Sequence, residues 1–161
     1  MHPEGTPSGR IVAISVSKRK GIPKSNIDAV RLIENFGLEG DVHGGNWHRQ
    51  VSFLALESID CMRSKGLPNL RPGAFAENIT TEFIDIPNLS IGSRVQIGAD
   101  AELEITQIGK ECHDKCAIFF RVGDCVMPRE GIFARVIKGG VIAVGDHVTV
   151  ATMISSNVGI A

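Results

Sequence analysis

The chain has 161 residues, enough for a single domain that buries a substantial core without disulfides or metals. Its formal net charge is −1 and its aromatic share is 5%, with no Tyr, so neither a basic patch nor a stacking surface for nucleic acid is expected. No apolar run approaches membrane-spanning length, and the opening MHPEGTPSGR lacks the apolar core of a signal peptide. We therefore expect a cytoplasmic protein with no nucleic-acid or membrane partner, whose four cysteines are reduced.

Short apolar–polar alternation is the main structural signal. Residues 1–9, rich in Pro, Gly and Ser, predict a flexible lead-in; the domain is expected over residues 10–151, with a frayed tail at 152–161. Alternating runs bounded by turn residues predict strands at 10–16, 26–33, 51–54, 77–81, 94–97, 102–108, 132–136 and 147–151. Many short strands favour a mainly β fold, a closed or nearly closed β-barrel.

One helix is predicted at residues 55–65, ALESIDCMRSK, before the helix-ending Gly66 and Pro68. Cys61 is expected on the apolar face of this helix, as a small buried hydrophobic side chain.

Three loops hold residues that could carry chemistry, and the first is GDVHGG at residues 40–45, followed by His48 and Arg49. Its glycines would let the backbone approach a ligand, while His43 and Arg49 could contact an anion. A plain Gly-rich turn capped by Asp41 explains the same composition.

The second loop is RPGAFAENIT at residues 71–80. The amide of Asn78 supplies a donor and an acceptor together, which suits hydrogen bonding to a heterocycle. A Pro-Gly turn leading into a strand is the alternative.

The third loop is GKECHDKC at residues 109–116, directly after a predicted strand. Lys110, His113 and Lys115 surround Cys112, and nearby cations favour the thiolate that attacks electrophiles or binds metals. Cys112 would then be a working thiol near the rim of the barrel.

Two other interpretations of Cys112 stay open. A structural zinc site could use Cys112, His113, Cys116 and Cys125, although paired ligand units are incomplete here. Cys112 could also be a buried, inert thiol.

Five segments in order, GLEGDVHGG, HRQVSFLALES, PGAFAENITT, IGSRVQIG and LEITQIGKECH, together resemble the MOSC domain. This domain is named for the C-terminal part of molybdenum cofactor sulfurase, and the resemblance, to its small stand-alone form, runs from about Arg10 to about Ala151. It implies a twisted β-barrel in which Cys112 stands at the family's marker cysteine, after the strand ending in T-Q. There the cysteine either carries sulfur as a persulfide or ligates molybdenum in a bound pterin cofactor.

The resemblance also implies a cofactor site. It puts Lys24, in GIPKS, and Arg49 near an anion site for the cofactor's phosphate. The full set of expected cofactor-binding residues is Lys24, His43, Arg49, Asn78 and Lys110. His113 and Cys116 are auxiliary candidates; Cys116 either resolves a persulfide as a transient disulfide or packs inward ahead of AIFF.

Three functions follow from the resemblance, in this order. The first is a sulfur carrier that sulfurates a molybdenum or tungsten pterin cofactor through a Cys112 persulfide. Its partners would be a cysteine desulfurase, which holds the pyridoxal phosphate that this chain does not itself bind, and a molybdo- or tungstoenzyme client. The second is a cofactor-binding carrier with Cys112 as metal ligand. The third is a reductase of N-hydroxylated compounds, although the chain has no iron–sulfur cysteine run or flavin motif for electron supply.

Overall fold

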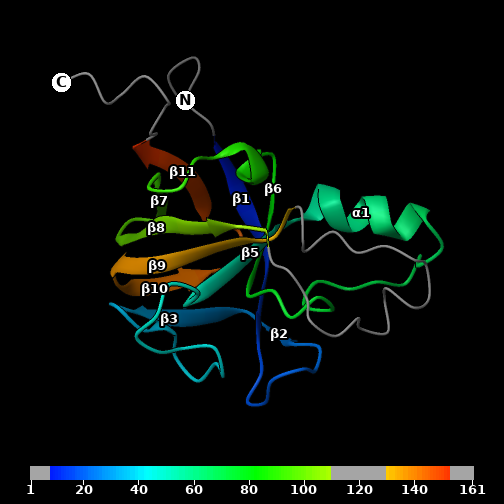
Figure 1. Cartoon of the computed structure of the whole chain (residues 1–161), viewed down its shortest axis with the longest axis horizontal. Helices are drawn as coiled ribbons and strands as arrows, with labels where there is room; N and C mark the ends of the chain where they lie inside the picture. Colours follow the sequence, from blue (N-terminus) through cyan, green and yellow to red (C-terminus); the bar gives the residue numbers. More distant parts are fainter. Residues whose placement is uncertain (1–7, 110–129, 153–161) are drawn as a thin grey trace.

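The computed structural model describes residues 8–109 and 130–152, and within them a closed ring of strands forms the body of the molecule (Figure 1). The ring runs β11-β7-β8-β9-β5-β6-β1 and closes where β1 pairs with β11. All neighbouring strands are antiparallel except β5 and β6. The strand bounds are β1 Ser8–Val16, β5 Val51–Ala55, β6 Ile79–Glu82, β7 Arg94–Ile97, β8 Ala101–Ile108, β9 Ile132–Lys138 and β11 His147–Thr152. The predicted mainly β barrel is confirmed.

The remaining elements decorate this barrel. Strand β2, Ser25–Ile27, extends the sheet beyond β1, and a second sheet has the order β10-β3-β4. Its strands are β3 Ala29–Ile33, β4 Gly37–Leu38 and β10 Gly140–Ala143; the helices are α1 Leu56–Ser64 and the 3₁₀ turn η1 Ile86–Asn88. No helix in the described ranges has the length and apolar character needed to cross a membrane.

The single strand predicted at residues 26–33 is wrong, because a bend at Asp28 divides it between two sheets. On one side of the bend Ile27 pairs with Ile14 of β1, and on the other Ala29 pairs with Ala143 of β10. Each half takes its hydrogen bonds from a partner distant in sequence, and local alternation does not encode that choice.

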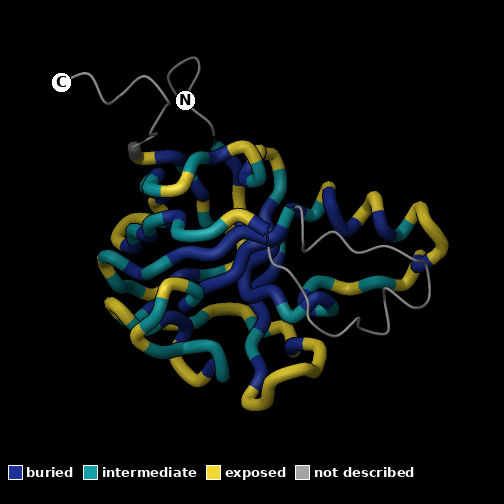
Figure 2. Tube along the Cα trace, viewed as in Figure 1, coloured by how far each residue is buried: buried dark blue, intermediate teal, exposed yellow. Residues whose placement is uncertain are grey.

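The core occupies the barrel interior, where the central strands are largely buried (Figure 2). Strand β8 alternates buried and half-buried residues along most of its length, as expected when one face packs inward. Strand β5 is instead buried at every position, because a smaller cluster covers its outer side. That cluster joins Leu54 to Ile59 and Met62 of α1, to Phe75, and to Phe133 of β9.

Helix α1 turns Ser58, Ile59 and Met62 inward, while Cys61 is exposed. The expectation of a buried Cys61 is therefore wrong. With 3.6 residues per turn, Cys61 lies nearly opposite Ile59, the residue that anchors the helix on the smaller cluster. Cys61 is an accessible thiol.

One end of the barrel gathers the strand ends that adjoin the segments singled out by the sequence. Phe53 of β5 pairs both with Ile79, the first residue of β6, and with Ile132, the first residue of β9. Ile79 also faces Ile14 near the end of β1, and Ile132 faces Ile108 at the end of β8. The chain therefore leaves β1 and β8, and enters β6 and β9, at the same level. The described loop after β1 and the turn before β6 meet there, where the backbone N–H of Lys24 donates to the carbonyl of Gly73.

Candidate functional site

A cavity of about 230 Å³ lies at this end of the barrel. Its lining comes from the loop after β1, the segment before β5, the turn before β6 and the strands β5 and β9. The lining residues are Lys20, Gly21, His43, Trp47, Arg49, Ser52, Phe75, Ala76 and Phe133. Two lysine or arginine side chains and one histidine line it, and none of the described lining residues is Asp or Glu, so the cavity suits an anion.

Arg49 is the dominant charge in this lining. Its guanidinium carbon lies 4.7 Å from the centroid of the Trp47 ring and 5.7 Å from that of Phe133. Trp47 is itself held in place by donating its indole N–H to the carbonyl of His43 at 2.8 Å. The Nε atom of Arg49 is buried without a partner in the described structure. A guanidinium that packs against two rings and whose Nε has no acceptor among the described residues is suited to bind a planar or tetrahedral oxyanion.

Behind the cavity lies a buried ion pair between Lys24 and Asp41, whose side chains are both fully buried. The ammonium of Lys24 contacts Oδ1 of Asp41 at 2.7 Å, Nδ1 of His43 at 2.9 Å and Oγ of Ser17 at 3.1 Å. These groups tie the loop after β1 to the Gly-rich segment that carries His43.

Asp41 accepts further hydrogen bonds from the backbone N–H groups of Ser17 at 3.0 Å and His43 at 3.2 Å. Burial alone would raise the pKa of Asp41. The neighbouring His43 side chain, the hydrogen bond and charge of Lys24, and the backbone N–H of Ser17 outweigh burial and hold that pKa well below its usual range. Asp41 is therefore ionised and holds the Gly-rich segment in place. The alternative of a turn capped by Asp41 gives this residue a similar structural role.

The turn before β6 forms one wall of the cavity and is organised by Glu77, which is fully buried. Its carboxylate accepts from the backbone N–H of Gly73 at 2.7 Å, from that of Phe75 at 3.1 Å and from Oγ1 of Thr80 at 3.0 Å. Burial raises the pKa of Glu77, and these hydrogen bonds only partly oppose the effect. Glu77 thus fixes the position of Phe75 in the lining.

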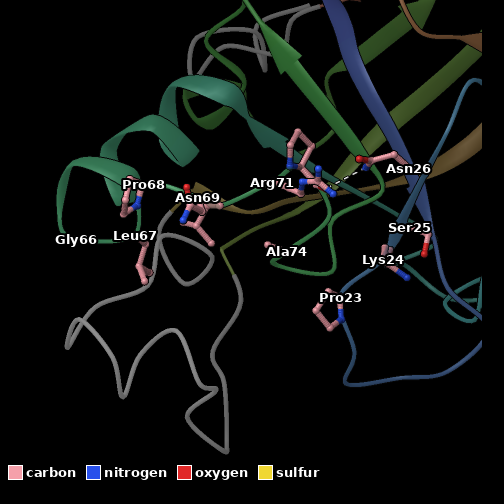
Figure 3. A pocket seen from close by; sticks show the side chains of 12 residues that line it. Pro23, Lys24, Ser25, Asn26, Gly66, Leu67, Pro68, Asn69, Arg71 and Ala74 are labelled. Atoms are coloured by element: carbon pink, nitrogen blue, oxygen red, sulfur yellow. Dashed lines mark hydrogen bonds between the residues drawn. The ribbon is translucent and has the colours of Figure 1, made fainter.

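A second, larger cavity of about 650 Å³ is lined in part by the same turn (Figure 3). It is lined by Pro23, Lys24, Ser25, Asn26, Gly66, Leu67, Pro68, Asn69, Leu70, Arg71, Pro72 and Ala74. Here Arg71 supplies the accessible charge, because the ammonium of Lys24 is engaged by Asp41, His43 and Ser17. The turn at residues 71–77 therefore contributes to the lining of both cavities.

The family model for the MOSC domain matches residues 39–149, more than half of the chain. The chain belongs to the MOSC domain family. That family is associated with molybdenum cofactor binding and sulfuration. A search of curated proteins found no match.

Solved structures share the fold of this MOSC chain. The YUAD protein from Bacillus subtilis superposes with a TM-score of 0.79 at 18% identity, over 92% of this chain and 98% of that one. YiiM from Escherichia coli gives a TM-score of 0.65 at 16% identity, over 91% of this chain and 72% of that one. YiiM from Geobacillus stearothermophilus gives 0.66 at 20% identity, over 95% and 78%. At these identities the likeness concerns the fold.

The smaller cavity fits the anionic part of a molybdenum pterin cofactor. Lys20 and Arg49 offer positive charge and His43 offers an N–H donor for a phosphate, and the buried Nε of Arg49 has no acceptor among the described residues. Aromatic side chains in the same lining suit a planar heterocycle. Of the expected cofactor-binding residues, the structure brings His43 and Arg49 together here, with Lys24 directly behind His43.

Asn78 lies in the barrel wall instead of the lining. Its Oδ1 accepts from the backbone N–H of Ser52 at 3.0 Å, and its Nδ2 donates to the carbonyl of Ser15 at 3.1 Å. The amide predicted to meet a heterocycle therefore joins β5 to β1, and it supports the cavity through Ser52, which lines it.

Strand β8 leads toward the marker cysteine from beside this cavity. Oε1 of Gln107 lies 2.8 Å from Nε2 of His48, and Oγ1 of Thr106 donates to the carbonyl of His48. The backbone N–H of Gly109 donates to the carbonyl of Gly131 at 2.6 Å. Other predicted residues lie outside the described ranges: Lys110, Cys112, His113, Cys116 and Cys125. In the described ranges no group of three His, Cys, Asp or Glu could hold a metal ion, and the zinc alternative falls outside them.

Sequence reasoning missed Lys20, Trp47, Phe75 and Glu77. Trp47 had a usable signal, because it is the chain's single Trp and lies between His43 and Arg49. Glu77 offered a weaker signal, an acid four residues after a Pro-Gly turn, where a carboxylate can bridge the turn's free N–H groups.

Proposed function

We propose that this MOSC chain handles a molybdenum or tungsten pterin cofactor and acts as a sulfur carrier through a persulfide on Cys112. The observation that supports cofactor handling most strongly is the Arg49 guanidinium, which packs against Trp47 and Phe133 and whose buried Nε has no acceptor among the described residues. Family membership supports the cofactor's identity. The place of β8 supports the link to Cys112, since that strand ends beside the cavity a few residues before the cysteine.

In this proposal each group has a defined task. Arg49, His43 and Lys20 hold the phosphate, and Trp47 packs against the heterocycle. The bound cofactor supplies the metal that accepts sulfur. Cys112 receives that sulfur from a pyridoxal-phosphate cysteine desulfurase. Its thiolate attacks the outer sulfur of the donor's cysteine persulfide, the donor's S–S bond breaks, a new S–S bond forms on Cys112, and the donor leaves as a thiolate.

The test is persulfide mapping by mass spectrometry after incubation with a cysteine desulfurase and free cysteine. Cys112 is expected to gain one sulfur atom, and Cys112→Ser to abolish loading without altering the fold. Cys61 is the matched control, because it is an exposed thiol on α1 and should stay unloaded. Equal loading of both cysteines, or none on Cys112, would reject the sulfur-carrier role.

The cavity also favours a second candidate, a cofactor-binding carrier in which Cys112 ligates the metal. A phosphate site is needed for cofactor retention whether or not sulfur moves. The molybdenum and pterin content of purified Cys112→Ser separates the two candidates. A variant that keeps the pterin but loses metal supports the carrier; a variant that keeps both while losing persulfide supports sulfur transfer.

A further inference from the structure

The contacts of Lys24 decide which nitrogen of His43 carries a hydrogen. A lysine ammonium has three N–H donors and no acceptor. In this structure it has three polar neighbours within hydrogen-bonding distance: Asp41 at 2.7 Å, His43 Nδ1 at 2.9 Å and Ser17 Oγ at 3.1 Å. Each donor therefore meets one acceptor, and Nδ1 of His43 must present its lone pair to Lys24.

The competing arrangement would place a hydrogen on Nδ1 and direct it to Asp41. Nδ1 lies 3.7 Å from Oδ2 of Asp41, which is too long for a hydrogen bond. An N–H on Nδ1 would also face the ammonium of Lys24 at 2.9 Å, donor against donor. Asp41 instead takes the backbone N–H of His43 at 3.2 Å. The distances and the number of donors on Lys24 both favour the arrangement in which Lys24 donates to a bare Nδ1 of His43.

We infer that Lys24 is a positioning residue that holds His43 in the tautomer with its hydrogen on Nε2. His43 lines the smaller cavity, and Nε2 makes no hydrogen bond within the described residues. The neutral ring therefore offers the cavity a donor and not a lone pair. A ligand group opposite His43 is an acceptor, such as a phosphate, carboxylate or carbonyl oxygen.

This arrangement explains why a fully buried lysine lies beside a cationic cavity without lining it. A lysine facing the ligand would add charge, but its long flexible side chain would not fix the direction of the donor. Lys24 instead acts through the imidazole, whose donor direction is fixed by the ring. Asp41 balances the buried ammonium, and its backbone contacts keep the ring's segment in place.

The direct test is long-range ¹H–¹⁵N NMR of the histidine rings in ¹⁵N-labelled full-length protein. The His43 signals are assigned by their loss in His43→Asn. The wild-type spectrum is expected to show a protonated Nε2 and a bare Nδ1 at neutral pH. A protonated Nδ1 with a bare Nε2 would overturn the inference, and this measurement needs no folded variant of Lys24.

Lys24→Met shows whether Lys24 itself sets the tautomer. Without the ammonium, Asp41 becomes the polar group beside Nδ1, so the hydrogen is expected to move from Nε2 to Nδ1. A purely structural lysine would leave the tautomer unchanged, and that result would overturn the inference. His48 is an internal control, because its Nε2 contacts Gln107 and not Lys24. Lys24→Arg keeps donors beside Nδ1 and should restore the wild-type tautomer.

A second readout rests on the proposed phosphate site. With inorganic phosphate as the probe, Lys24→Met is expected to bind about tenfold more weakly than wild type, the loss of roughly one hydrogen bond. Lys18→Met removes an exposed lysine of the same loop and should change affinity less than about twofold. Equal losses of phosphate affinity in Lys24→Met and Lys18→Met would show that Lys24 does not act on the ligand through His43. If wild type binds no phosphate, the proposed function fails while the tautomer spectrum still decides the inference.

Discussion

Arg49 carries two opposing energetic effects. Packing of the guanidinium against Trp47 and Phe133 is favourable, by about 0.5–2 kcal/mol for such contacts. The buried Nε, which meets no acceptor in residues 8–109 and 130–152, costs about 1–3 kcal/mol. A bound ligand that supplies the acceptor would remove this cost.

Arg49→Met separates these effects. Methionine keeps apolar contact with both rings and removes the unpaired donor, so the free energy of unfolding should change by less than about 1 kcal/mol. Phosphate affinity should fall by about 10–100-fold. Urea unfolding and calorimetric titration measure the two quantities. Arg19→Met, outside the cavity lining, should leave affinity nearly unchanged; a large loss of stability without loss of affinity would make Arg49 a structural residue.

Asp41 links the site to acid stability. Its pKa in the folded protein is lowered, so the folded state binds fewer protons than the unfolded chain as the solution is acidified. The stabilisation is therefore present above the ordinary Asp pKa of about 4 and is lost progressively as the pH falls below it.

Asp41→Asn is expected to cost about 3–5 kcal/mol at neutral pH, because it leaves the buried ammonium of Lys24 without its counter-ion. The variant should also show a shallower fall of stability below about pH 4. Unfolding curves across pH measure both. Glu39→Gln removes an exposed pairing with Arg31, 3.9 Å long, and should change stability by less than about 0.5 kcal/mol. Matching acid profiles for wild type and Asp41→Asn would contradict the depressed pKa.

At the scale of elements, the turn before β6 shapes both cavities. Gly73 has a φ of 96°, and a Cβ there would lie 2.5 Å from the carbonyl oxygen of Lys24. The same Gly73 donates its N–H to Glu77 and accepts from the N–H of Lys24. Close approach of two backbones therefore requires glycine at this position.

Gly73→Ala should destabilise the protein by about 2–5 kcal/mol, the sum of a left-handed backbone and an overlap with fixed backbone atoms. Gly21→Ala is the matched control: Gly21 has a φ of 78° but no neighbour within 4 Å of a Cβ. It should cost only about 1–2 kcal/mol. Equal losses in the free energy of unfolding of Gly73→Ala and Gly21→Ala, measured in urea, would show that the backbone at Lys24 can move away from a Cβ at residue 73.

Sequence alternation predicted the elements that have one buried face. Strand β7 has the predicted bounds, Arg94–Ile97, because its residues alternate between core and outer surface. Strand β4, two residues long, and β10, Gly140–Ala143, escaped prediction because neither run is long enough to show a period. For the site, His43 and Arg49 followed from a Gly-rich loop. The pairing of Lys24 with Asp41 did not, because it joins loops that only the barrel brings together.

At the scale of the whole molecule, closure of the barrel depends on a short contact between β1 and β11. Ser8, Gly9 and Arg10 pair there with Thr149, Val148 and His147. Val148 also faces Ile97 of β7 and is fully buried. Loss of this contact would open the ring. The strand ends that bear the site would then no longer be held in fixed positions relative to one another.

Val148→Asp places an unpaired carboxylate in the core at the closure and should cost more than about 4 kcal/mol. Val141→Asp is the control on β10, where the side chain is 59% exposed, and should change stability by less than about 0.5 kcal/mol. Thermal unfolding measures both. If Val148→Asp unfolds cooperatively at the same midpoint temperature as wild type, closure of the barrel contributes little to the stability of the fold.

We propose that the cavity holding Arg49 and His43 retains a pterin cofactor in a chain whose Cys112 handles sulfur. The most direct measurement is the pterin and molybdenum content of protein purified from cofactor-producing cells, for wild type, Arg49→Met and the control Arg71→Met from the larger cavity. We predict that wild type and Arg71→Met retain both pterin and metal, and that Arg49→Met loses them while remaining folded. Retention by Arg49→Met equal to wild type, or loss only in Arg71→Met, would contradict the account.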